Sequence, residues 1–230
     1  MKQIDILNLM RTRPLFSIND LSRVLRKKPE YVKLVAYRLE KKGMIKKIER
    51  GKYTVHDDPM IFSSHIIVPS YIGLWTAMRF HNLTEQQPKE IMVISPKPKN
   101  SVRFEGTTIT FTKLKHFWGY KKERYREFDI FMAEKEKTII DGLLTKKIPL
   151  DEILNAVKSG LDTTKLMDHT LRTGNSSLAK RIGYLLDHLG MDPERLLSII
   201  DNNYISLDPH YKKSGTKNDK WKLIINRRLE

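Results

Sequence analysis

Hydrophobic residues recur at helical spacing soon after Phe16. The apolar positions of this first segment are Ile18, Leu21, Val24 and Leu25. Ser17 and Asp20 stand three residues apart, which is the spacing of a helix capping box, and Phe16 is placed to form a hydrophobic staple with Leu21. The pattern therefore predicts a helix that begins near Ile18 and ends at the polar turn of residues 26–28.

A second helical pattern begins at Pro29, which suits the first helical position because its missing N–H would have no partner there. Gly43 predicts the end of this helix, since glycine adopts the left-handed conformation of a C-terminal cap. One face is apolar and carries Val32, Val35, Ala36 and Leu39. The opposite face carries Lys33, Leu34, Tyr37, Arg38 and Lys41, a set that fits a DNA groove.

Two short alternating runs, residues 45–48 and 52–55, flank Glu49, Arg50 and Gly51 and predict a hairpin with a basic tip. An opening helix that ends before Pro14 is predicted from Ile4, Ile6, Leu7 and Met10. Three helices followed by a basic hairpin predict a winged helix-turn-helix over residues 1–58.

The next stretch, residues 61–148, alternates between helix and strand patterns and predicts a mixed α/β region, with the boundary near residue 60. We expect a helix over residues 71–81, capped by Ser70, with a stripe of Tyr71, Leu74, Trp75 and Met78. Strands are expected at residues 90–94, 102–104, 109–111 and 128–132.

The last stretch, residues 149–230, predicts helices separated by Gly160, Gly174 and Gly190, with a fourth helix opened by Pro193. A basic tail follows residue 205, and residues 223–225 are predicted to add an edge strand. The predicted fold class is therefore α+β, with an N-terminal winged helix-turn-helix, a mixed α/β region and a C-terminal helical region.

The charge is concentrated near the start of the chain. The net charge is +16, and residues 1–59 hold 15 Lys and Arg against 7 Asp and Glu. An acidic partner is expected, and double-stranded DNA fits the predicted helices and hairpin. A winged helix that contacts only proteins is the alternative. We expect base contacts from Tyr31, Lys33, Leu34, Tyr37 and Arg38. We expect phosphate contacts from Lys27, Lys28, Arg50 and Lys52.

A second basic stretch surrounds residues 117–120 and contains Lys113, Lys115, Lys121, Lys122, Arg124 and Arg126. It would extend the DNA footprint or bind RNA, or else form a solvated loop with no ligand. Tyr71, Trp75, Trp118 and Tyr120 are aromatic side chains of the kind that stack on unpaired bases. Core packing is the preferred interpretation for Tyr71 and Trp75, because their spacing matches the helix stripe.

Enzymatic chemistry finds little support in the sequence. Glu134, Glu136 and Asp141 are interpreted as parts of surface ion pairs with nearby lysines. Residues 174–181 (GNSSLAKR) lack the second glycine of a phosphate loop, so Asn175 or Ser176 is expected to cap a helix. Cysteine is absent, which excludes disulfides, zinc–cysteine sites and thiol nucleophiles, and the histidines show no paired ligand spacing. We expect no catalytic residue, metal or cofactor.

No run of about 18 apolar residues occurs, and Met1 leads into a charged amphipathic segment rather than a signal peptide. The expectation is a cytoplasmic protein without a membrane partner.

Four further motifs occur in order at residues 70–88 (SYIGLWTAMRFHNLTEQQP), 117–120 (FWGY), 133–143 (AEKEKTIIDGL) and 178–186 (LAKRIGYLL). Together they resemble the AbiEi abortive-infection antitoxins of the type IV toxin–antitoxin class. The sequence departs from the family's helix motif at Gly73 and Thr76, and Asn82 replaces a loop glycine. With the predicted winged domain, the resemblance covers about residues 5–200, and no family pattern covers the segment after residue 205.

The resemblance implies an N-terminal domain that represses the protein's own operon by binding its promoter. It also implies a C-terminal part that counters a nucleotidyltransferase-like toxin encoded beside it, without forming a stable complex with that toxin. The alternative function is a winged-helix adaptor or an RNA-binding protein without an antitoxin role. The chain lacks the Gly-Ser dipeptide and paired aspartates that a nucleotidyltransferase would need.

Overall fold

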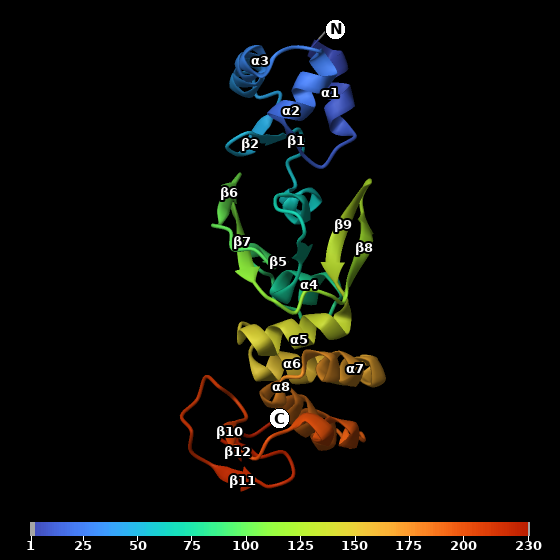
Figure 1. The fold of residues 1–230 in the computed structure, drawn as a ribbon, viewed down its shortest axis with the longest axis vertical. Coiled ribbons are helices and arrows are strands. Elements are labelled where there is room, and N and C mark those ends of the chain that lie inside the picture. Colours follow the sequence, from blue (N-terminus) through green and yellow to red (C-terminus); the bar gives the residue numbers. More distant parts are fainter. Residues whose placement is uncertain (1–2, 230) are drawn as a thin grey trace. The chain divides into compact units, whose positions relative to one another are not determined.

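The computed structural model describes residues 3–229, with side chains from Ile6 onward, and it has an α+β fold (Figure 1). The chain forms two compact units. Unit 1 comprises the chain through Ile72 together with Pro88–Met132. Unit 2 comprises Gly73–Gln87 and the chain from Ala133 onward. The chain therefore passes between the units three times.

Three helices begin unit 1: α1 (Gln3–Arg11), α2 (Ile18–Leu25) and α3 (Pro29–Lys41). The predicted capping box at the start of α2 is confirmed, since Asp20 N donates to Ser17 Oγ at 3.1 Å and Ser17 N donates to Asp20 Oδ2 at 2.8 Å. Pro29 occupies the start of α3, and Gly43 has a φ of +67° after its end. The expected helix limits are thus confirmed.

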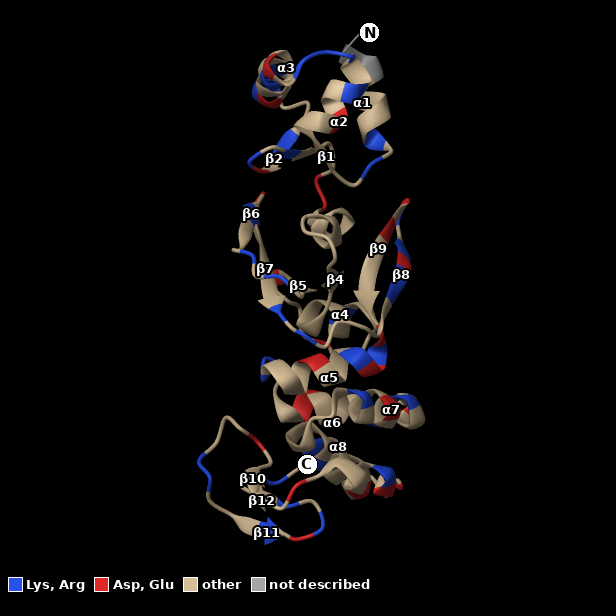
Figure 2. Ribbon diagram, in the orientation of Figure 1, with Lys and Arg blue, Asp and Glu red and all other residues tan. Residues whose placement is uncertain are grey.

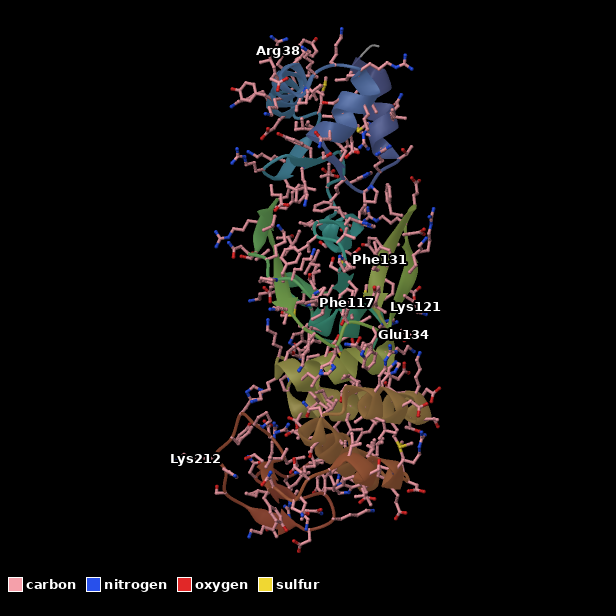
Figure 3. All side chains as sticks on the ribbon, in the orientation of Figure 1. Arg38, Phe117, Lys121, Phe131, Glu134 and Lys212 are labelled. Carbon is pink, nitrogen blue, oxygen red and sulfur yellow. The ribbon has the colours of Figure 1, made fainter. Side chains whose placement is uncertain are left out.

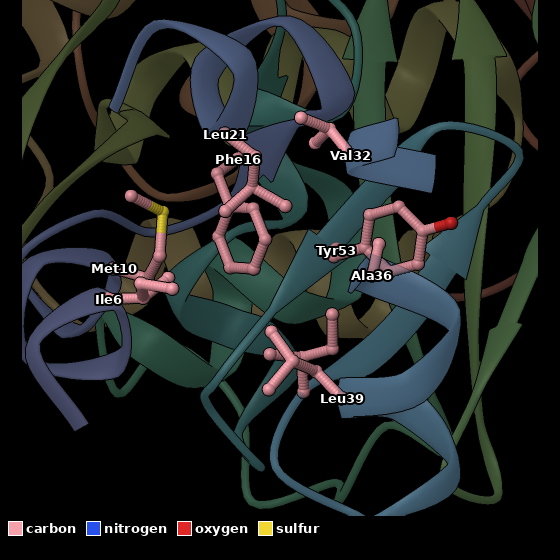
Figure 4. Packing of buried hydrophobic residues seen from close by; sticks show 9 residues of the cluster. Ile6, Met10, Phe16, Leu21, Val32, Ala36, Leu39 and Tyr53 are labelled. Atoms are coloured by element: carbon pink, nitrogen blue, oxygen red, sulfur yellow. The ribbon is translucent and has the colours of Figure 1, made fainter. Parts of the chain in front are cut away.

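A three-stranded antiparallel sheet accompanies these helices, with β3 (Lys52–Thr54) between β1 (Phe16–Ser17) and β2 (Lys46–Glu49). The hairpin predicted from residues 45–55 is confirmed. Helices and sheet share one hydrophobic core (Figure 4). Its buried members are Ile6, Met10, Phe16, Leu21, Val32, Ala36, Leu39, Ile45 and Tyr53. The predicted contribution of Ile4 lies outside the described side chains.

The rest of unit 1 is built on a mixed six-stranded sheet of order β6-β7-β5-β4-β9-β8. The strands are β4 (Tyr71–Ile72), β5 (Glu90–Ser95), β6 (Val102–Phe104), β7 (Thr107–Lys113), β8 (Tyr120–Tyr125) and β9 (Phe128–Ala133). β5 and β7 run parallel over six residue pairs, whereas β4 and β9 share only the pair Ile72–Met132. Two short 3₁₀ helices, η1 (Pro59–Ile61) and η2 (Ser63–His65), precede β4.

One sequence prediction is wrong in this region, and one strand was not predicted. The helix expected over residues 71–81 is α4 (Leu74–Phe80), which starts after Gly73, and Tyr71 belongs to strand β4. Strand β8 was not predicted, because its sequence YKKERY is mostly charged and lacks an apolar alternation. Pairing with β9 stabilises this strand, which has no stripe of buried side chains of its own.

Unit 2 is mainly helical (Figure 1). Besides α4, its helices are α5 (Lys135–Thr145), α6 (Leu150–Lys158), α7 (Thr163–Thr173) and α8 (Ser176–His188). The helix predicted after Pro193 is a 3₁₀ helix, η3 (Glu194–Ile199), rather than an α-helix. Three short strands close the chain: β10 (Ile205–Ser206), β11 (Thr216–Asn218) and β12 (Leu223–Ile225). β12 lies between the other two, so its predicted edge position is wrong.

The segment after residue 205 is anchored on α8. Trp221 is fully buried, and its Nε1 donates to Asp187 Oδ2 at 2.8 Å. Buried Arg181 donates from Nε to Leu207 O at 2.9 Å and from Nη2 to Ser206 O at 3.0 Å. These bonds satisfy carbonyl groups at the start of the segment. The basic tail of the prediction is therefore an ordered part of unit 2.

Residues 3–229 contain no helix with the length and apolar character needed to cross a lipid bilayer.

Candidate nucleic-acid interface

The predicted recognition face of α3 is exposed to solvent. Val32, Ala36 and Leu39 turn into the core, which fixes the rotation of the helix about its axis. On the other side Tyr31, Leu34 and Tyr37 are 52%, 46% and 55% exposed. Lys33 and Arg38 are exposed on the same side, and Figure 3 labels Arg38 on α3. The structure thus brings all five predicted base-contact residues onto one accessible face.

A groove of about 640 Å³ lies between the start of α3 and the β2–β3 hairpin. Its lining residues are Ser17, Ile18, Asn19, Pro29, Lys33, Lys47, Arg50, Gly51 and Tyr53. Lys33, Lys47 and Arg50 supply three positive charges, and none of the three forms an ion pair with the side chains of residues 6–229. Figure 2 shows the basic residues of α3 and the hairpin. We call this feature the basic groove.

Lys52, a predicted phosphate contact, is engaged elsewhere. Its Nζ donates to Ile66 O and pairs with Glu49 Oε1 at 2.9 Å. Lys99 Nζ also donates to Glu49, at 2.6 Å. Burial would raise the pKa of Glu49, but the hydrogen bonds from Lys99 and Lys52 outweigh burial and lower it. Lys52 therefore helps to neutralise a partly buried carboxylate, and a phosphate group would have to compete with Glu49 for it.

Lys47 is a groove residue that the sequence analysis missed. Its neighbour Lys46 pairs with Asp57 at 2.8 Å and with Glu105 at 3.2 Å, and the hydrogen bond to Asp57 raises the pKa of Lys46. A register shift in the ladder lies between Lys47 and Glu49. Because Glu105 is distant in sequence, the residues next to Lys46 and Lys47 do not show which of the two lysines forms ion pairs. The alternation of side chains along a strand, with Ile48 buried, is the feature of the sequence that would have predicted an exposed Lys47.

Lys27 and Lys28 lie in the tight turn between α2 and α3. Arg26 adopts a left-handed φ of 52°, and Lys27 N donates to Ser22 O at 3.3 Å. Lys28 is the N-cap residue of α3. Both lysine side chains are exposed, so the backbone of the turn is fixed while its charges face solvent.

The second basic stretch is different, because carboxylates on β8, on β9 and before η1 pair with its cations. Lys121 pairs with Glu123 at 2.8 Å, and Lys122 and Arg124 pair with Asp129 at 3.2 and 3.3 Å. Arg126 pairs with Asp58 at 3.0 Å. The hydrogen bond from Lys122 is the main cause of the lowered pKa of Asp129. Lys113 and Lys115 are exposed on and just after β7. Blue and red therefore alternate along β8 in Figure 2.

The aromatic side chains of unit 1 form a packed cluster. Tyr71 is fully buried, and its ring stacks on that of Tyr120 with centroids 4.8 Å apart and an interplanar angle of 13°. Phe117 lies 5.2 Å from Tyr71, and Phe131 lies 6.2 Å from Tyr120. Core packing is confirmed for Tyr71, although it belongs to a strand. In unit 2, Trp75 Nε1 donates to Lys147 O at 3.0 Å.

The carboxylates considered for catalysis take part in ion pairs, but one of these pairs is not on the surface. Lys137 and Asp141 are fully buried and directly bonded, so the predicted surface pair is wrong. Burial lowers the pKa of Lys137, and the charge of Asp141 opposes that effect. Glu134 accepts from Lys165 at 2.9 Å and lies 3.5 Å from His169 Nε2.

Two further features bear on chemistry in unit 2. Asn175 Oδ1 accepts from Leu178 N at 2.9 Å, which confirms helix capping in place of a phosphate loop. No set of three or more His, Asp or Glu side chains with a metal-binding arrangement occurs in the described part of the chain.

Three of the four motifs that resemble AbiEi supply packing or hydrogen-bond contacts within unit 2. Thr84 of the first motif donates to Glu152 Oε2 at 2.7 Å, and Gly142 of the third leaves room for Ile148. Gly183 of the fourth lies under the ring of Trp221. These contacts contribute to the packing of unit 2. Comparisons with models of protein families and with curated proteins give no match to this chain.

Proposed function

We propose that residues 3–58 form a winged helix-turn-helix that binds double-stranded DNA. In this proposal α3 enters the major groove and the β2–β3 hairpin is the wing. The observation that carries it is the basic groove beside the exposed face of α3, where Lys33, Lys47 and Arg50 have no acidic partner among the described side chains. A phosphate backbone that follows this groove would bring base edges to Leu34 and Arg38.

We further propose that the protein represses its own operon and acts as the antitoxin of a type IV system. The likeness of residues 70–88, 117–120, 133–143 and 178–186 to the AbiEi family supports this role, and so does the expected winged domain. The partner would be a nucleotidyltransferase-like toxin encoded nearby, opposed without a stable complex. Unit 2 and the six-stranded sheet of unit 1 would serve the antitoxin role.

The second basic stretch gives less support to the alternative of an RNA-binding protein. Four of its six cations are paired with Glu123, Asp129 or Asp58. A phosphate backbone would have to displace those carboxylates, and exposed pairs of this kind offset the local positive charge. The cations of the basic groove have no such competitors.

Arg38→Ala tests the recognition role of α3. A guanidinium that hydrogen-bonds a guanine edge contributes about 1–3 kcal/mol of discrimination. We therefore expect the variant to lose that much affinity for the chain's own promoter and little affinity for random duplex DNA. Footprinting on the promoter, followed by competition binding, measures both quantities. Arg23→Ala, a change in an exposed arginine of α2, is the matched control.

Equal losses on promoter and random DNA would make Arg38 a phosphate contact. Absence of any protected stretch on the promoter would refute autoregulation. For the antitoxin role, co-expression with the neighbouring gene from an independent promoter should relieve growth arrest caused by that gene. Unrelieved arrest would refute it.

A further inference from the structure

The exposed face of α3 is apolar at its centre, which is unusual for a surface surrounded by positive charge. Leu34 is 46% exposed, with Tyr31 three residues before it and Tyr37 three residues after it. Residues at these spacings are neighbours on a helix surface. Leu34 therefore stands between two exposed aromatic rings, with Arg38 one turn further along.

The helix lacks the side chains that recognise adenine. Residues 29–41 (PEYVKLVAYRLEK) contain no Asn or Gln, the residues that bond the N6 and N7 atoms of adenine together. The exposed hydrogen-bonding groups are those of Glu30, Lys33, Arg38 and Lys41 and the tyrosine hydroxyls. The usual bidentate contact to adenine is therefore absent from this helix, whereas the 5-methyl group of thymine offers an apolar contact that suits Leu34.

We infer that Leu34 and its flanking tyrosines form an apolar site for thymine methyl groups, so that the protein binds a thymine-containing sequence beside the guanine contacted by Arg38. This inference rests on the proposed DNA-binding function. Leu34 and Arg38 are four residues apart, or about 6 Å along the helix. Successive bases of a strand are about 3.4 Å apart, so the thymine lies within about two base pairs of that guanine.

A second copy of the chain is the other occupant that an apolar face would suit. The surrounding charge argues against it. A two-fold contact would bring together two copies of the same surface, each with Lys33, Arg38 and Lys41, and this excess of like charge would oppose association. Duplex DNA offers both the methyl groups and the negative charge that these cations need.

The experiment removes the methyl groups without changing the hydrogen-bonding edges. Full-length protein is titrated with the protected promoter duplex and with duplexes in which deoxyuridine replaces thymidine, one position at a time. The wild-type protein should bind about three- to fivefold less tightly at each critical position, as expected for one buried methyl group. Leu34→Ala should bind the thymine duplex less tightly and lose the preference for thymine over uracil.

Leu9→Ala is the matched control, because Leu9 is an exposed leucine of unit 1 on α1, 42% exposed. This variant should keep the full preference for thymine. Circular dichroism should show that both variants fold, since neither side chain belongs to the core.

The outcomes separate the inference from the function on which it rests. Equal binding of thymine and uracil duplexes by the wild-type protein would overturn the inference while leaving the proposed function intact. A wild-type dimer that Leu34→Ala converts to a monomer would also overturn it, because the apolar face would then be a contact between copies. Failure to bind the promoter in preference to random duplex would refute the proposed function itself.

Discussion

At the scale of single residues, Gly183 has an environment that few other side chains would tolerate. A Cβ atom at this position would lie 2.1 Å from Cζ3 of Trp221, and the indole ring is fully buried. The ring cannot move away without disturbing its bond to Asp187. Because position 183 of α8 carries no side chain, the ring of Trp221 and the C-terminal segment that contains it can pack against this helix.

Gly183→Ala should lower the free energy of unfolding by about 1–3 kcal/mol, as is typical when a well-packed core is overfilled. The gain in helix propensity, about 1 kcal/mol, works in the opposite direction and reduces the net effect. Urea denaturation monitored by tryptophan fluorescence measures the change. Ser177→Ala, on the same helix, is the control and should stay within about 0.5 kcal/mol. A stabilised Gly183→Ala protein would contradict the described packing.

Asp201 should make the stability of the folded protein depend on pH in acid solution. Hydrogen bonds from Lys180, Asn203 N and Ser176 lower the pKa of Asp201 from 3.8 to about 2. A carboxyl whose pKa is lowered by folding stabilises the protein above its unfolded pKa, and that contribution disappears as pH falls through the folded value. The window therefore runs from about pH 4 down to about pH 2.

We expect Asp201→Asn to be less stable than the wild-type protein at pH 5, with the difference shrinking as the pH is lowered to 2. Urea midpoints measured across that range test this. A difference that stays constant from pH 5 to pH 2 would show that charge on Asp201 contributes nothing.

At the scale of elements, the hairpin and α3 act through the basic groove between them. The hairpin's cations divide into two classes, because Lys46 and Lys52 pair with carboxylates whereas Lys47 and Arg50 do not. Only unpaired cations release counterions from DNA at no cost to an internal ion pair. The salt dependence of binding therefore distinguishes the two classes.

Replacing Lys47 and Arg50 together by Ala should reduce the slope of log affinity against log salt by about 1.8, at about 0.9 for each phosphate contact. Lys52→Ala is the control and should leave the slope unchanged, while Lys99 still pairs with Glu49. Filter binding to random duplex DNA over a range of salt concentrations gives both slopes. An unchanged slope in the double variant would place the hairpin outside the interface.

Sequence patterns predicted elements well where one face of a helix is buried locally. α2, α3 and the first hairpin follow from caps and periodicity because their core partners lie within residues 6–53. The same reasoning failed for Tyr71, whose ring partner Tyr120 is distant in sequence. It also missed β8, because the charged sequence of this strand has no apolar alternation, although its neighbour β9 follows it directly. It also failed for Lys137 and Asp141, since a charged pair four residues apart has the same sequence pattern whether buried or exposed. In the candidate site, the exposed face of α3 was predictable from the sequence. The pairing of Lys52 and Lys46, which leaves Lys47 as the groove cation, was not predictable, because it depends on Ile66, Lys99 and Glu105.

At the scale of the whole molecule, the basic groove and all of α3 belong to unit 1, and the anchored C-terminal strands belong to unit 2. The proposal assigns DNA binding to the first of these regions alone. Damage to the packing of unit 2 should therefore leave that activity in place as long as unit 1 stays folded.

Gly183→Ala should accordingly bind the promoter duplex with an affinity within about twofold of the wild-type value, at a temperature well below its unfolding transition. Arg38→Ala should show the converse, with weak binding and unchanged stability. Fluorescence anisotropy and thermal unfolding on the same preparations measure both. A large loss of affinity in folded Gly183→Ala protein would mean that the two units are energetically coupled.

The threefold passage of the chain between the units constrains how such a gene can be recombined. A splice at residue 132 would take α4 from one parent and its neighbour α5 from the other. A splice at residue 72 would separate β4 from its native partners β5 and β9. Recombination, natural or engineered, must therefore exchange the six-stranded sheet of unit 1 and the helices of unit 2 as one segment. A new DNA preference is more readily acquired by replacing the exposed positions of α3, which leaves every junction intact.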